Sequence, residues 1–217
     1  MNVLVMFDRE TNTLWSQLLG EAVEGPLKGT KLEFVPAVHM KWSEWKAQHP
    51  DTIALVKGFS GSLTSYSRYY ANNTAGVLGE TIEDERLRTK QLVVGVAIHG
   101  DAVAYPFFAV GREETLINDE VGGEPVLVVL DMEGRSGIVF SRRTPEGEIL
   151  TFSVKEGLTF TDQETGSTWD GWTGSAIDGP LEGTQLERIR STKSFWFGWK
   201  DFYPETRVYS EGIESSE

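Results

Sequence analysis

An internal repeat constrains this chain more than any other feature of its sequence. Residues 8–52 (the first copy) align with residues 162–206 (the second copy) at a constant offset of 154, without a gap, and with 18 identities in 45 positions. Both copies carry D-x-E-T, then W, G-x-A, G-P-L-x-G-T-x-L-E and finally W-x-x-W-K-x-x-x-P-x-T. Unrelated segments do not match at this level, so the sequence predicts an internal duplication.

The residues that the two copies share are typical of turns, strands and a short helix. Asp8 and Asp162 open turns in which an Asp side chain accepts hydrogen bonds from amides just ahead. The G-P-L-x-G-T stretch combines a proline that fixes φ with glycines that tolerate positive φ. Trp42 and Trp45 have i, i+3 spacing, which favours a short helix with its aromatic face on a sheet. Core packing is preferred for these tryptophans over a sugar-stacking role.

The repeat also divides the chain into parts. The stretch before the second copy has no counterpart before the first copy, so the chain is expected to begin part-way through its first unit. The sequence therefore predicts the C-terminal half of a first repeat unit in residues 1–56, a connector in residues 57–91 and a complete second unit in residues 92–217. The alternative for the connector is a functional loop over a site.

The second unit reads as successive short strands separated by turn signals. Apolar or alternating runs occupy residues 92–98, 102–105, 137–141 and 149–154, and the fully apolar run 126–130 is expected to be a buried strand. The polar stretch 112–118 is interpreted as a short helix. Together these patterns predict a mostly β fold, sandwich or barrel-like, with a few short helices.

Composition excludes several classes of function. The chain has 217 residues, a formal net charge of −13 and scattered Lys and Arg, so nucleic acid is not an expected partner. The absence of cysteine removes disulfides, thiolate nucleophiles and Cys-ligated metals. His39, His49 and His99 are not spaced to share a helix face, and no metal or other cofactor is predicted. No apolar run reaches the roughly 18 residues of a membrane helix, so membrane insertion is not expected.

Several motifs in order resemble one known family. They are Val93–Val96 followed by Ala104-Tyr105-Pro106, then N-D-E-V-G-G at residues 118–123, F-S-R-R at residues 140–143, and the repeated kit described above. On these residues the whole chain resembles tandem members of the domain of unknown function family 3179. The resemblance implies no established reaction. It suggests an extracytoplasmic location, although the first residues carry no signal peptide pattern, and the compartment stays open.

The resemblance also implies where a site would lie in typical members. They carry a His-Glu pair ahead of the N-D-x-V-G-G motif and a C-P-x-C-G-S motif after the next apolar strand, which together look like a metal or thiol site. In this chain the first region reads Gly111-Arg112-Glu113-Glu114, and the cysteine positions fall on Asp131 and Gly134. The imidazole and both sulfurs are therefore missing, which indicates a decayed ancestral site.

Two functions follow from these observations. The first is a non-catalytic β-rich binding or assembly module, in which residues 3–56 pack on the second unit or on another copy of the chain, in a homo-oligomer, and complete a sheet. The alternative is a carboxylate-dependent hydrolase or lyase acting on a carbohydrate-like substrate. Its candidate carboxylates, and the tryptophans near them in sequence, are Asp131, Glu133, Asp162 and Glu164 with Trp169 and Trp172.

Overall fold

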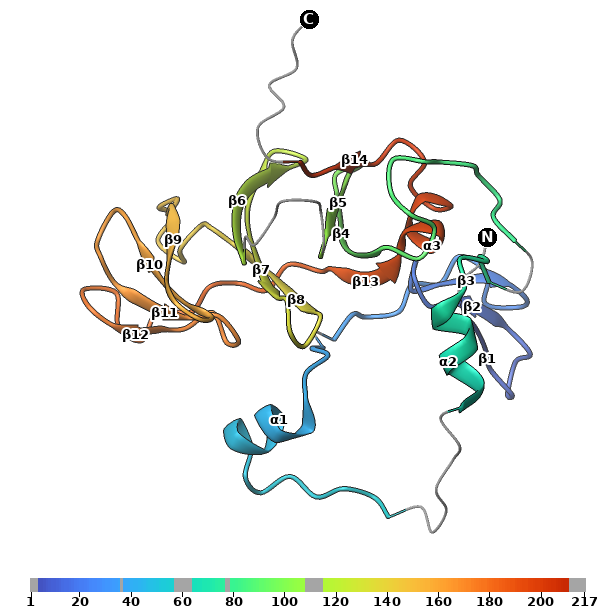
Figure 1. The fold of residues 1–217 in the computed structure, drawn as a ribbon, viewed down its shortest axis with the longest axis horizontal. Coiled ribbons are helices and arrows are strands. Elements are labelled where there is room, and N and C mark those ends of the chain that lie inside the picture. The colour runs from blue at the N-terminus through green and yellow to red at the C-terminus, as the bar shows by residue number, and fades with distance from the viewer. Residues whose placement is uncertain (1–3, 36, 57–63, 77–78, 108–114, 211–217) are drawn as a thin grey trace, which may run out of the picture.

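Four antiparallel or mixed sheets dominate the computed structural model of the chain (Figure 1). The structure describes residues 4–35, 37–56, 64–76, 79–107 and 115–210. Within these ranges there are 14 strands and three short helices, and no sheet closes into a barrel. The mostly β, sandwich-like class predicted from the sequence is confirmed.

The first copy folds into a small sheet followed by a helix. The strands β1 (Val5–Phe7), β2 (Leu14–Ser16) and β3 (Glu21–Glu24) pair in the order β1-β2-β3, and the helix α1 spans Trp42–Gln48. The second copy holds β10 (Thr159–Asp162), β11 (Thr168–Asp170), β12 (Ala176–Asp178) and the helix α3 (Trp196–Lys200), and β9 (Phe152–Glu156) extends its sheet to β12-β11-β10-β9.

The two copies share their strand register as well as their sequence pattern. Met6 pairs with Trp15 as Phe160 pairs with Trp169, and in both copies the register shifts at that tryptophan. The indole Nε1 of Trp45 donates to Thr52 Oγ1 at 2.9 Å, and the indole of Trp199 donates to Thr206 Oγ1 at the same distance. The common origin of the two copies stays a prediction, but their local geometry is alike.

Two further sheets form the centre of the molecule. One has the order β13-β4-β5-β14, and the other has the order β6-β7-β8. Their bounds are β4 Leu92–Ile98, β5 Asp101–Pro106, β13 Thr192–Phe195, β14 Arg207–Val208, β6 Leu116–Val121, β7 Glu124–Asp131 and β8 Ser136–Ser141.

The apolar core lies between three stacked sheets. Side chains such as Val96, Tyr105 and Val128 fill the space between the β4–β5 sheet and the β6–β8 sheet. Leu127 and Val129 point the opposite way, toward Phe152 and the sheet of the second copy. Strand β7 is therefore buried on both faces, which confirms the prediction for its apolar run 126–130.

A third apolar cluster covers the outer face of the β4–β5 sheet. Trp196 and Trp199 of α3 pack there against small and β-branched residues of β4 and β5. Gly95 makes this close approach possible, because a Cβ at that position would lie 2.3 Å from the Trp199 ring. The prediction of a helix resting its tryptophans on a sheet therefore holds for the second copy.

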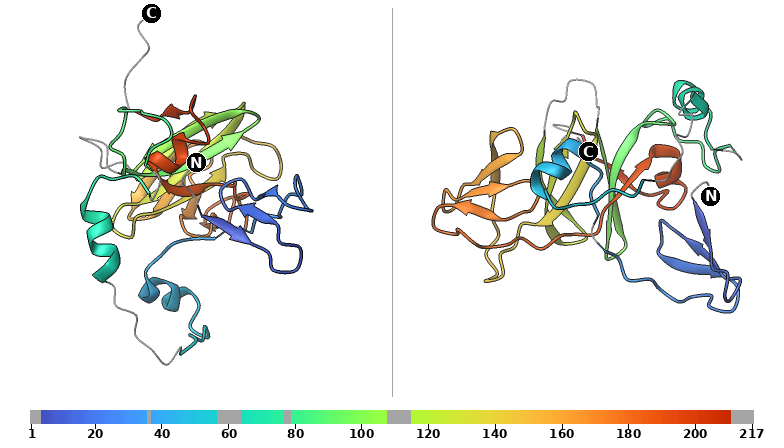
Figure 2. Two further views of the ribbon diagram at one scale, coloured as in Figure 1. Left: turned by 90° about the vertical axis from the view of Figure 1, so that its right-hand side faces the viewer. Right: turned by 90° about the horizontal axis from the view of Figure 1, so that it is seen from below.

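The strands β1–β3 of the first copy lie at the α3 end of the stack, where Leu18 joins the cluster around Trp196 and Trp199 (Figures 1 and 2). The guanidinium of Arg190 fixes this contact by donating to the carbonyl oxygen of Leu18 at 2.7 Å. Its described strands, however, pair only with one another. The expectation that residues 3–56 complete a sheet of the second unit is not met by these strands.

Two local expectations need correction. Residues 116–118 of the stretch interpreted as a helix begin strand β6, and Leu116 and Ile117 pair with Val129 and Val128. Burial of these two apolar side chains against β7 outweighs the polar character of the window. The rest of that stretch, residues 112–114, lies outside the described residues. The connector 57–91 contains a helix, α2 (Thr64–Ala71), which the sequence reading did not anticipate.

Candidate functional site

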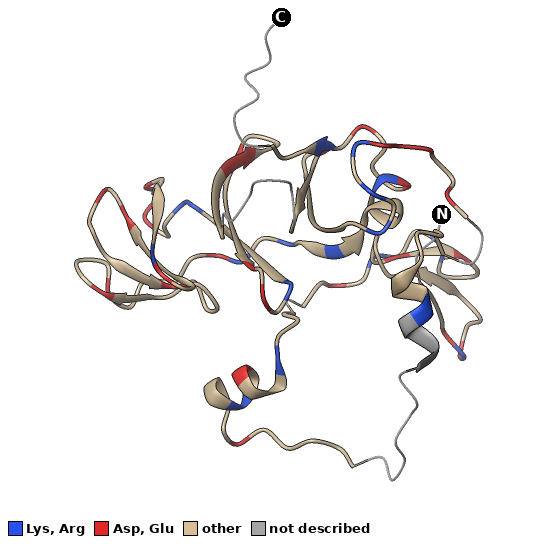
Figure 3. Cartoon of the chain, viewed as in Figure 1, with Lys and Arg blue, Asp and Glu red and all other residues tan. Residues whose placement is uncertain are grey.

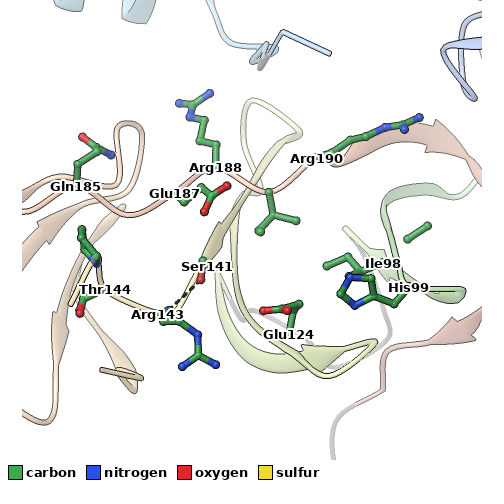
Figure 4. Close-up of a pocket in the computed structure, with 13 residues that line it drawn as sticks. Ile98, His99, Glu124, Ser141, Arg143, Thr144, Gln185, Glu187, Arg188 and Arg190 are labelled. Carbon is green, nitrogen blue, oxygen red and sulfur yellow. Dashed lines mark hydrogen bonds between the residues drawn. The ribbon is translucent and has the colours of Figure 1, made fainter. Parts of the chain in front are cut away.

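An open groove of about 690 Å³ lies beside the β4–β5 turn. Its walls come from the end of β8 and the segment after it, from the β4–β5 turn, and from residues 185–190, which follow the second-copy sheet (Figure 4). Both acidic and basic side chains line this groove. None of the four carboxylates selected from the sequence is among its lining residues.

The arginines of the groove do not converge on a common point. Figure 4 shows Arg143, Arg188 and Arg190 pointing in three different directions. Arg188 donates to the carbonyl oxygen of Trp172 and lies 5.7 Å from the centre of the Phe140 ring, and Arg190 lies 3.3 Å from that of Phe34. Burial lowers the pKa of the Arg188 guanidinium. These side chains hold neighbouring segments together, so the groove has no focused anion site.

His99 also lacks the surroundings of a catalytic base. It sits in the β4–β5 turn with a φ of +49°, and its Nδ1 lies 3.1 Å from the carbonyl oxygen of Gly122. Ser141, the hydroxyl residue nearest the middle of the groove, accepts the amide of Arg143 at 3.0 Å. No described contact joins His99 to Ser141, so the groove holds no assembled nucleophile and base.

Two of the carboxylates selected from the sequence lie at the end of β7. Asp131 Oδ1 accepts hydrogen bonds from the backbone amides of Glu133 and Gly134 at 3.1 and 3.0 Å, which is the geometry of a turn. Glu133 is exposed and accepts a hydrogen bond from Lys41 of the first copy. The hydrogen bond from Lys41 lowers the pKa of this carboxyl group.

The other two carboxylates belong to a different sheet. Asp162 is buried and accepts the amide of Thr165 at 2.6 Å and the indole N–H of Trp169 at 2.9 Å. Its burial acts to raise its pKa, but the hydrogen bonds from Trp169 and Thr165 outweigh it, and the pKa is lowered. Glu164 is exposed and accepts the amide of Thr151 at 2.8 Å. The structure thus places the four carboxylates in turns and at a surface, not across one cleft.

The tryptophans near these carboxylates are part of the core. Trp169 is fully buried and meets Phe152 edge to face at 5.7 Å between ring centres, and Trp172 is partly buried against the same cluster. Stacking of a sugar on the Trp169 ring would require the second-copy sheet to open.

Three residues of the motif at residues 118–123 have structural roles. The Asn118 amide bridges to β9 through both the carbonyl and the N–H of Phe152, each at 2.8 Å. Asp119 accepts the hydroxyl of Tyr105 at 2.8 Å and pairs with Arg207 at 3.0 Å. Gly122 has a φ of +57°, and a Cβ there would lie 2.3 Å from the Ile98 carbonyl oxygen. The motif therefore positions strands and a tight turn.

The resemblance implies that the site of typical members would fall at residues 111–114, Asp131 and Gly134. Residues 111–114 lie outside the described residues. At the cysteine positions, Asp131 caps a turn, and a Cβ on Gly134 would lie 2.0 Å from Asp131 Oδ2. Throughout the described ranges there is no group of three or more His, Asp or Glu that could hold a metal ion.

The feature that sequence reasoning missed is an uncovered stretch of the first copy. Trp42 and Trp45 are 54% and 36% exposed, whereas their counterparts Trp196 and Trp199 are 0% and 2% exposed. Beyond α1, the apolar residues of 53–56 are almost fully exposed. We call residues 42–56 the uncovered segment, and α1 stands away from the stacked sheets in Figures 1 and 2. A run of four apolar residues directly after the repeat was the available signal.

Charge gives no second candidate. Figure 3 shows Lys and Arg interspersed with Asp and Glu along the described ribbon rather than gathered on one element. None of the three helices that the structure describes is long and apolar enough to cross a membrane.

Fold and site together define a layered, β-rich protein in which residues 8–52 and 162–206 share a sequence pattern and local geometry but differ in burial. The chain matches the family described as "Protein of unknown function (DUF3179)" over residues 1–206, and it belongs to that family. The resemblance drawn from the motifs is thereby confirmed. No curated protein and no solved structure matches the chain.

Proposed function

We propose that this chain is a non-catalytic binding or assembly module, and that the uncovered segment is its docking surface. The observation that carries the proposal is the contrast between the equivalent tryptophans, exposed in the first copy and buried in the second. Apolar patches that remain exposed on a folded protein commonly mark interaction sites. The turn-bound positions of the candidate carboxylates further favour binding over carboxylate chemistry.

In a solution of the pure chain, only a second copy can cover this surface. We therefore expect reversible self-association of residues 1–217 in sedimentation velocity runs over a wide concentration range. The double variant Trp42→Ser/Trp45→Ser should raise the apparent dissociation constant by about tenfold or more, since each buried aromatic contributes more than 1.4 kcal/mol to such contacts.

The matched control is Ile177→Ser, which removes an apolar side chain that is 52% exposed on β12 of the second copy. This variant should associate as the wild type does. A double variant that associates as strongly as the wild type would remove the proposed function, as would a wild-type chain that stays monomeric and also fails to bind a hairpin peptide with the sequence of residues 91–107.

A further inference from the structure

In the second copy, the residues that match the uncovered segment pack against a β-hairpin. Its strand β13 pairs antiparallel with β4, from Thr192 opposite Gly95 to Phe195 opposite Leu92. Its strand β14 pairs in parallel with β5, with Val208 opposite Ala104. The β4–β5 hairpin is thus held between two strands of the second-copy end, and α3 covers the outer face of the same hairpin.

The first copy has the same elements of this clamp, but no hairpin lies between them in the described residues, and Val38 packs instead against the cluster around Trp169. Residues 38–41 correspond to β13 and residues 53–54 correspond to β14 at the offset of 154, and neither forms a strand in the described structure. Ile53 is 93% exposed, and residues 53–56 make no backbone hydrogen bond with another described residue. Between them, α1 keeps the internal geometry of α3, with Trp45 4.2 Å from His49 where Trp199 is 4.3 Å from Tyr203, measured between ring centres.

We infer that the first copy binds a second antiparallel β-hairpin of the β4–β5 type. This inference rests on the proposed function and names its partner. Residues 38–41 and 53–56 would add a strand to each edge of the hairpin, antiparallel on one side and parallel on the other, and α1 would cover its outer face. Main-chain pairing at sheet edges is a general mode of peptide recognition.

The second copy also specifies the chemistry of the partner. Trp199 fits against β4 only because Gly95 carries no side chain, and Ala102 and Ala104 keep the neighbouring surface shallow. The bound hairpin therefore needs a glycine opposite Trp45 and small residues beside it. The apolar run Ile53-Ala54-Leu55-Val56 favours an apolar edge strand over a charged one.

A second copy of this chain is not the source of the hairpin. Both edges of its β4–β5 hairpin are already paired, and its outer face lies under α3. Because that hairpin belongs to the same chain as its own clamp, it has a high effective concentration there and a competing site on another molecule takes it rarely.

A synthetic peptide with the sequence of residues 91–107, Gln91 to Phe107, tests the inference. Isothermal titration of the full chain with this peptide should give one binding site, and the peptide should reverse the self-association described above. Binding should weaken about tenfold or more for the chain variant Trp45→Ala and for a peptide carrying Gly95→Leu, whereas Ile177→Ser should bind as the wild type does. The peptide variant leaves the protein itself unchanged, so its result does not depend on the folding of a mutant chain.

Absence of peptide binding, or equal binding of the Gly95→Leu peptide, would overturn the hairpin as partner. If Trp42→Ser/Trp45→Ser still weakens self-association in that case, the docking surface stands and only its occupant is wrong. If neither measurement depends on these tryptophans, the proposed function falls as well.

Discussion

Replacing Trp199 by alanine is expected to lower the free energy of unfolding by about 3–5 kcal/mol, the range for deleting a fully buried large aromatic. Trp199 packs on Gly95 and donates its indole N–H to Thr206, so the variant loses core contacts and leaves a cavity. The equivalent change Trp45→Ala should cost about 1 kcal/mol or less, because that ring is partly exposed and loses chiefly one hydrogen bond. Urea unfolding of both variants measures the difference.

This pair of variants is an internal control, since the two tryptophans occupy matching positions of the same kit. Equal losses of stability would mean that α1 is packed as tightly as α3, and that the first copy has no uncovered face. A large loss of stability for Trp199→Ala alone would support the view that α3 is covered by a partner structure and α1 is not.

Replacing Asp162 by alanine is expected to lower the free energy of unfolding by about 3 kcal/mol at neutral pH, because it leaves the buried indole N–H of Trp169 without an acceptor. The amide and hydroxyl of Thr165 lose the same partner. Asp8→Ala should have a smaller effect, because Asp8 is less buried and accepts from the amide of Glu10 and from Thr11, with no indole N–H among its described partners. Chemical denaturation at pH 7 gives both values.

The effect of Asp162 should also depend on pH in a defined direction. Its pKa in the folded protein is lowered, so its contribution is complete above the ordinary Asp pKa of about 3.9 and is lost as pH falls toward the folded value. The difference in unfolding free energy between wild type and Asp162→Ala should therefore shrink as the pH falls below about 4. A difference that grows on acidification would show that the carboxylate is not the stabilising form.

The sequence was most informative where a residue type has one physical use. The repeated D-x-E-T and G-P-L-x-G-T patterns predicted turns because Asp caps amides and Gly accepts positive φ, and Gly25 and Gly179 do have φ values of 104° and 98°. The apolar run of β7 could be predicted for the same reason, since only burial on both faces suits such a strand.

The sequence was least informative where tertiary contacts decide. Trp45 and Trp199 are identical residues in matching helices, and nothing local distinguishes the exposed ring from the buried one. The difference comes from Gly95, about a hundred residues before Trp199, whose strand covers one helix and not the other. Polar Asn118 was placed in an expected short helix, yet its amide serves strand packing.

The candidate carboxylates show the same limit for function. Sequence proximity grouped Asp131 with Glu133 and Asp162 with Glu164, but each Asp faces amides of its own turn, and the two pairs lie in different sheets. A chemical role needs convergence in space, which spacing along the chain cannot establish. The uncovered segment, by contrast, is visible only when the burial of the two copies is compared.

Hydrogen–deuterium exchange of residues 1–217, with and without the 91–107 peptide, tests the central claim most directly. In the chain alone, at concentrations too low for self-association, we expect the amides of residues 53–56 to exchange freely and those of residues 207–209 to be protected by pairing with β5. Addition of the peptide should slow exchange at residues 38–41 and 53–56 and leave the rest unchanged. Protection of residues 53–56 without any peptide, or no change on adding it, would contradict the account.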